Sequence, residues 1–206
     1  MSEFKVGKIN KKIIHSDILN RDVTLSVYLP EDYTNLFKYQ LIFCFDGLDF
    51  FRFGRIQRIY EQLREEQSIQ RAIIVGFHYE DVEKRREEFH PSGRRSNLTI
   101  KAMGKEILPY IDATFPTYKV GNTRLLIGDS LAGSIALEEE DFILPTNGKR
   151  ANFLTPNREL NQLIKEGNTE YFYKEFKGGH HWKSWKPLLG DILLKFLSNQ
   201  INGKYV

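Results

Sequence analysis

The chain has 206 residues, of which 41% are hydrophobic and 28% are charged, and its net charge is +3. Basic and acidic residues are mixed along the chain, so we expect no nucleic-acid partner. The N-terminus carries no apolar stretch of signal-peptide length, and no run is long enough to cross a membrane. We therefore expect one cytoplasmic domain, residues 1–206, with no membrane partner; the oligomeric state stays open.

Cysteine and histidine usage gives no sign of a metal site. Cys44 is the only cysteine, which excludes an intramolecular disulfide, and its surroundings LIFCFDG favour a small buried hydrophobe. His15, His78 and His90 are scattered without metal-ligand spacing, and we expect structural roles for them. The sequence thus predicts no metal and no cofactor.

Strand signals come first in chain order. Residues 12–30 predict two alternating strands around the turn signal LNRD. Three short, nearly unbroken apolar runs then follow, at 40–47, 71–78 and 123–130. Runs of this kind are typical of parallel strands that are buried on both faces.

Helical patterns separate these strands. Apolar residues recur at helical spacing in 55–67 and in 100–115, where Pro109 should kink or break the helix. A helix over 157–168 and a strand over 169–176 come next. A last helix presents an inner stripe of Trp182, Trp185, Leu189, Ile192 and Phe196. The alternation predicts an α/β fold with a mostly parallel central sheet and helices on both faces.

Ligands of such sheets bind at the carboxyl ends of the strands. The stretch GDSLAG (128–133) lies at one of these ends, directly after a buried strand. A nucleophile on a sharp strand-to-helix turn needs small neighbours, and Gly128 and Ala132 flank Ser130 in this way, although Ala132 departs from the strict G-x-S-x-G pattern. The pattern favours a nucleophilic Ser130; the alternative is a turn serine that caps the helix.

A nucleophilic serine requires a base and an anion-stabilising pocket. The loop KGGHH offers His180, which directly follows two glycines, in preference to His181; the alternative is a surface loop ahead of the last helix. The amides of Leu131 and of Leu48, at the end of another strand, are candidate oxyanion donors. For Leu48 a simple strand-to-helix turn is an equally good interpretation.

These pieces, in this order, resemble a known family. The segments LIFCFDGLDFF, ILPYIDATFPTYKVGNTRLLIGDSLAG and YFYKEFKGGHHWKSW are similar to the α/β-hydrolase-fold serine esterases of the esterase-D-like group, which includes siderophore trilactone esterases. The resemblance covers most of the chain. It implies that Ser130 is the nucleophile and His180 the base. It also implies that the amides of Leu48 and Leu131 form the oxyanion hole.

The chain departs from this family after the serine. Only 50 residues separate Ser130 from His180, whereas the family places two further strand–helix units there, each of about 30 residues. We therefore expect a segment of about forty residues to be missing near residues 134–139. The triad acid is then hard to assign. Among the acidic residues that follow, Asp141 is the favoured candidate, and a solvated acidic run is the alternative.

The functional hypothesis is a serine hydrolase that cleaves carboxylic esters through an acyl-enzyme on Ser130. Its partner is a small-molecule substrate, either a simple acyl ester or a siderophore lactone. Four arginines, Arg85, Arg86, Arg94 and Arg95, follow one strand and would suit an anionic substrate, or else form a self-paired exposed loop. The alternatives are a non-catalytic protein that kept the fold and an acyltransferase that uses the same acyl-enzyme.

Overall fold

The structure is a computed structural model that describes residues 5–66, 69–90, 92–133 and 180–198. Its sheet has the strand order β1-β2-β4-β3-β5. The strands are β1 (Lys8–Ser16), β2 (Arg21–Leu29), β3 (Gln40–Cys44), β4 (Ala72–Phe77) and β5 (Arg124–Ile127). All five predicted strands of this part of the chain are therefore present.

The sheet is mixed within the described residues. β1 and β2 form an antiparallel hairpin, and β2 also runs antiparallel to β4. β3 pairs in parallel with both β4 and β5, as the three apolar runs predict. Every residue of β3 and β4 is buried, because helices cover both faces of these strands.

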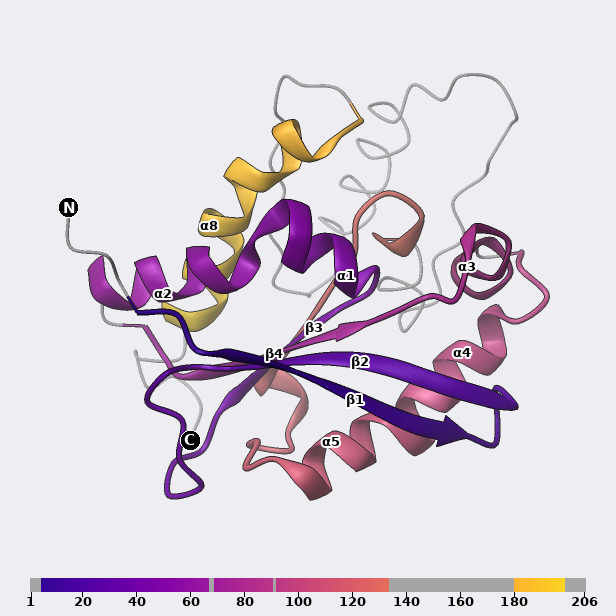
Figure 1. The fold of residues 1–206 in the computed structure, drawn as a ribbon, viewed down its shortest axis with the longest axis horizontal. Helices are drawn as coiled ribbons and strands as arrows, with labels where there is room; N and C mark the ends of the chain where they lie inside the picture. Colours follow the sequence, from indigo (N-terminus) through magenta and orange to yellow (C-terminus); the bar gives the residue numbers. More distant parts are fainter. Residues whose placement is uncertain (1–4, 67–68, 91, 134–179, 199–206) are drawn as a thin grey trace, which may run out of the picture.

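Two layers of helices enclose the sheet (Figure 1). One layer contains α2 (Ile56–Glu66), α8 (Trp182–Ser198) and the π-helical turn η1 (Phe50–Gly54), which follows the short α1 (Gly47–Asp49). The other layer contains α4 (Ser96–Ala102), the π-helical turn η2 (Met103–Ile107) and α5 (Leu108–Thr114). The helix α3 (Val82–Phe89) lies beyond the end of β4, and the single-turn 3₁₀ helix η3 (Gly121–Thr123) precedes β5.

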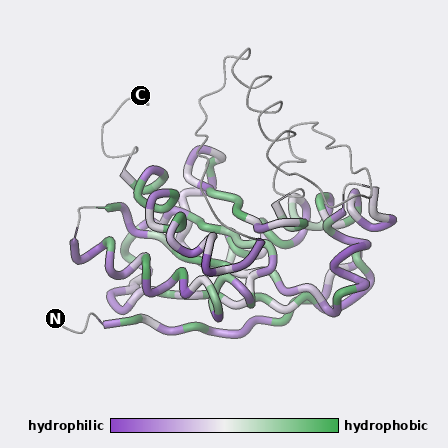
Figure 2. Tube along the Cα trace, turned by 90° about the horizontal axis from the view of Figure 1, so that it is seen from above, coloured by the Kyte–Doolittle hydropathy of each residue, from purple (hydrophilic) through white to green (hydrophobic). Residues whose placement is uncertain are grey.

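The hydrophobic core is split in two by the sheet. In β3, Leu41 and Phe43 pack into one cluster, whereas Ile42 and Cys44 pack into the other. This alternation follows from the two-residue period of a strand. Hydrophilic and hydrophobic stretches alternate along the helices, as expected where one helix face lies on a sheet (Figure 2). Cys44 is fully buried and free, as predicted.

Two helix predictions can be compared in detail. Pro109 lies at the start of α5, directly after η2, so the wider π-helical turn accommodates the backbone bond that proline cannot make. In α8 the buried residues are Leu189, Leu193 and Leu197, and the predicted tryptophans are only partly buried. The predicted stripe is confirmed in part, since Leu189 is buried and Trp182, Ile192 and Phe196 pack against the same core, but it missed Leu193 and Leu197.

The predicted helix over 157–168 and strand over 169–176 lie outside the described residues. Across the ranges that are described, no helix combines the length and the apolar character that a membrane crossing requires.

Candidate active site

A sharp turn connects β5 to the helical turn that starts at Leu131. Ser130 at its apex has φ 54°, in the left-handed region. A Cβ atom on Gly128 would lie 2.1 Å from the carbonyl oxygen of Ala132, and Ala132 itself is fully buried. The turn thus leaves no room for side chains at either flank. This crowding is the physical reason for the small residues on both sides of the serine.

His180 lies against this serine. Its Nε2 atom is 2.7 Å from Ser130 Oγ, a hydrogen-bond distance. The neighbouring His181 contacts Ser184 instead, with 3.2 Å between Nδ1 and Oγ. The structure therefore brings together the two residues that the sequence singled out, and it distinguishes between the two histidines.

Aromatic packing at the start of α8 fixes the place of His180. The Trp182 ring packs edge-on against Phe50 of η1, with 5.0 Å between ring centroids. Trp185 makes an edge contact with the His180 ring at 4.9 Å. Since η1 directly follows the turn after β3, these contacts hold the histidine at the carboxyl edge of the parallel strands.

The two candidate oxyanion donors lie at the same edge. The ends of β3 and β5 are joined by a hydrogen bond from Phe45 N to Ile127 O, 2.9 Å long. Leu48 and Leu131 each belong to the first turn of a helix, where backbone N–H groups have no intrahelical acceptor. Gly47 is needed for the Leu48 turn, because a Cβ atom there would lie 2.2 Å from the Cα of Gly76. Both amides therefore stay candidate oxyanion donors.

A buried ion pair, which sequence reasoning missed, anchors the Leu48 turn. Asp46 is 1% exposed and has φ 56°. The Arg85 guanidinium from α3 donates to both of its carboxylate oxygens, with Nε at 2.8 and 2.9 Å. Burial raises the pKa of the Asp46 carboxyl, and Arg85 opposes this shift. The only sequence signal was an aspartate before a glycine at a strand end.

Asp129, next to the nucleophile candidate, is in a poor environment for a charge. Its Oδ1 atom is buried and has no hydrogen-bond partner within the described part of the chain. Burial, assisted by the charge of Asp46, raises the pKa of Asp129 to about 7, and Arg85 opposes this. A carboxyl with a raised pKa favours the folded state while it is protonated. This contribution declines as the pH rises from the unfolded value of 3.8 towards 7.

Replacement of Asp129 by asparagine should therefore change the pH dependence of stability. We expect the melting temperature of Asp129→Asn, relative to the wild type, to increase between pH 5 and pH 8. Asparagine carries no charge to bury, whereas the wild-type side chain ionises across this range. Thermal melts at both pH values measure this difference. A difference that stays constant, or that falls with pH, would contradict the assignment.

The triad-acid candidate and the three other histidines from the sequence analysis remain to be placed. Asp141 lies outside the described residues. His15 contacts Asp22 at 2.9 Å, and His78 contacts Ser26 at 2.9 Å. His90 accepts a hydrogen bond from Ser92 N at 3.1 Å.

Three of the four candidate arginines are bound to other protein groups. Arg85 pairs with Asp46, Arg94 with Glu87, and Arg95 donates to the Leu19 carbonyl. The self-paired interpretation thus describes Arg94 and Arg95, which pair with Glu87 and Glu88, but not Arg85, whose partner lies outside this loop. Arg86 and Arg94 both line an open pocket, but of these two only Arg94 has an ion-pair partner among the described residues.

Comparisons with known proteins agree with the fold. A family model described as "Putative esterase" matches residues 16–138 and 137–196. A Bacillus subtilis protein, "Uncharacterized protein YjcH", is 33% identical over 237 residues, with 94% of this chain and 99% of the relative covered. The chain belongs to this esterase family, and it is a carboxylic ester hydrolase with an α/β-hydrolase fold.

Solved structures share this fold. A ferulic acid esterase has a TM-score of 0.75 at 14% identity, covering 94% of this chain and 98% of that one. The enterobactin esterase of Shigella flexneri has a TM-score of 0.54 at 18% identity and covers 63% of this chain, which spans 32% of that protein. At such identities the likeness concerns the fold alone.

Proposed function

We propose that the protein hydrolyses carboxylic esters with Ser130 as nucleophile and His180 as general base. Ser130 Oγ attacks the carbonyl carbon while its proton passes to His180 Nε2. The amides of Leu48 and Leu131 stabilise the negative charge that develops on the carbonyl oxygen. The alcohol then leaves with the proton from His180, and an acyl group remains on Ser130.

The second half of the reaction reverses these roles. Water attacks the acyl carbon and gives a proton to His180, and the acid leaves as Ser130 recovers its proton. One observation carries this proposal: the 2.7 Å separation of His180 Nε2 and Ser130 Oγ at a serine with left-handed backbone geometry. A serine that only capped the helix would need neither this geometry nor an imidazole beside its hydroxyl.

Asp141 stays our candidate for the residue that orients the His180 ring. The missing segment also stays a proposal, supported by two comparisons. The family model matches in two parts that meet at residues 137–138, and the alignment with the Bacillus subtilis relative runs over 237 residues, longer than this chain. We propose that the chain lacks a segment of its relatives at this junction, within one domain of residues 1–206.

For the substrate we propose a small ester, with a simple acyl ester and a siderophore lactone as the two candidates. The names of the similar structures point to esters of aromatic acids and to a siderophore. The aromatic rings of Trp182 and Trp185, which contact each other beside His180, are compatible with an aromatic acyl group.

Covalent labelling tests the mechanism against the alternative of a non-catalytic protein with the same fold. A fluorophosphonate probe should label the wild type and fail to label Ser130→Ala, because only an activated serine attacks phosphorus. Ser184→Ala is the matched control: Ser184 also contacts a histidine, yet its variant should label like the wild type. Absence of labelling in the wild type would favour the non-catalytic alternative.

A further inference from the structure

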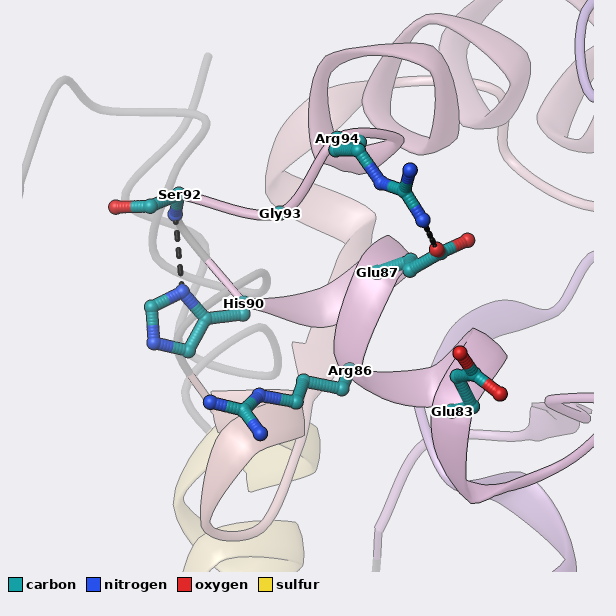
Figure 3. Close-up of a pocket in the computed structure, with 7 residues that line it drawn as sticks. All are labelled: Glu83, Arg86, Glu87, His90, Ser92, Gly93 and Arg94. Atoms are coloured by element: carbon teal, nitrogen blue, oxygen red, sulfur yellow. Dashed lines mark hydrogen bonds and ion pairs between the residues drawn. The ribbon is translucent and has the colours of Figure 1, made fainter.

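A pocket of about 450 Å³ lies beside α3 and the turn that follows it (Figure 3). Its lining is polar and carries both signs of charge. The residues are Glu83, Arg86, Glu87, His90, Ser92, Gly93 and Arg94. None of them takes part in the chemistry proposed for Ser130.

The two arginines of this pocket differ in their ion pairing. Arg94 is paired with Glu87, and Figure 3 shows this contact as a dashed line. The Glu83 carboxylate is directed away from the Arg86 guanidinium in the same view. Among the described residues, Arg86 forms no ion pair within 4.0 Å, so the guanidinium of this lining residue has no acidic partner there.

His90 adds a second donor on the same side. Its Nδ1 atom accepts a hydrogen bond from Ser92 N, so in the neutral ring the proton resides on Nε2. Arg86 and His90 project to one side of the helix in Figure 3. Two donors, one of them a planar cation, are suited to the two oxygens of a carboxylate.

The helix that lines the pocket is tied to the site edge described above. Arg85, which directly precedes Arg86, binds Asp46 in the turn that carries the Leu48 amide. Figure 1 shows the segment after β5, which contains Ser130, between α3 and the start of α8. A substrate at Ser130 can therefore extend a substituent towards α3.

We propose that Arg86 and His90 form a subsite for a carboxylate carried by the ester substrate. This inference rests on the proposed function and specifies its substrate class. The carboxylate belongs to either the acid or the alcohol part of the ester, and the two cases are separable by experiment.

Three esters test the subsite. p-Nitrophenyl butyrate is the neutral reference, p-nitrophenyl hemisuccinate carries a carboxylate in its acyl part, and 4-butyryloxybenzoate carries one in its alcohol part. The wild type should prefer one anionic ester over the reference, by kcat/KM. Arg86→Gln should reduce this preference about fivefold, the size expected for an exposed ion pair. His90→Gln should reduce it less, because only a neutral donor is lost.

Lys101→Gln is the matched control, since Lys101 is an exposed cation on α4 outside the pocket, and it should retain the wild-type preference. A wild type that prefers neither anionic ester would overturn the subsite. So would a loss of preference that is equal in Arg86→Gln and Lys101→Gln. If the wild type hydrolyses none of the three esters and resists the fluorophosphonate probe, the proposed function itself fails, which is a distinguishable result.

Discussion

Replacement of Ser130 by alanine is expected to lower kcat for p-nitrophenyl butyrate by about 10⁴-fold or more. His180→Gln should cause a comparable loss, because the hydroxyl 2.7 Å from Nε2 is a poor nucleophile without its base. The double variant should be hardly worse than either single variant, since the two groups act as a unit. Steady-state kinetics of the three variants measure these losses.

His181→Gln serves as the control for the histidine. It removes an imidazole from the adjacent position, which contacts Ser184 rather than Ser130. We expect its kcat to stay within a few fold of the wild type. An equal loss in the His180 and His181 variants would mean that the variants disturb the start of α8 rather than the chemistry.

Removal of the Arg85 guanidinium should destabilise the fold strongly. In Arg85→Gln the Asp46 carboxylate, 1% exposed, stays buried without its cation. Breaking a buried ion pair in this way costs about 3 kcal/mol or more of unfolding free energy. Chemical denaturation measures this loss.

Two further variants show whether the buried charge is the cause. The double variant Asp46→Asn with Arg85→Gln should recover part of the stability, since no uncompensated charge remains. Arg94→Gln breaks an exposed pair, in which the Arg94 side chain is 83% exposed, and should cost less than about 1 kcal/mol. Similar losses in Arg85→Gln and Arg94→Gln would contradict our account of the Asp46 turn.

Local crowding made the catalytic elbow predictable from the sequence. Gly128 and Ala132 must be small whatever surrounds them, because they meet each other across one turn. The position of His180 was also predictable in outline, since two glycines precede it after a strand-like segment. At the elbow, the steric requirement acts between residues that are close in the sequence. For His180, the position follows from the order of the strands and helices along the chain.

The Asp46–Arg85 pair was not predictable in this way. Its partners are 39 residues apart, and they meet only because β3 and β4 are neighbours in the sheet. The same limit applies to the arginines after β4. The sequence presents four of them alike, and only the positions of Asp46, Glu87 and Glu88 in the fold decide which of them are paired with a carboxylate.

The central claim is that the ester's acyl group passes through a covalent bond to Ser130. Rapid-quench mass spectrometry of the wild type during turnover of p-nitrophenyl butyrate tests this directly. Our account predicts a transient butyryl mass on the peptide that contains Ser130. Turnover accompanied by a butyryl group on a different residue would contradict it.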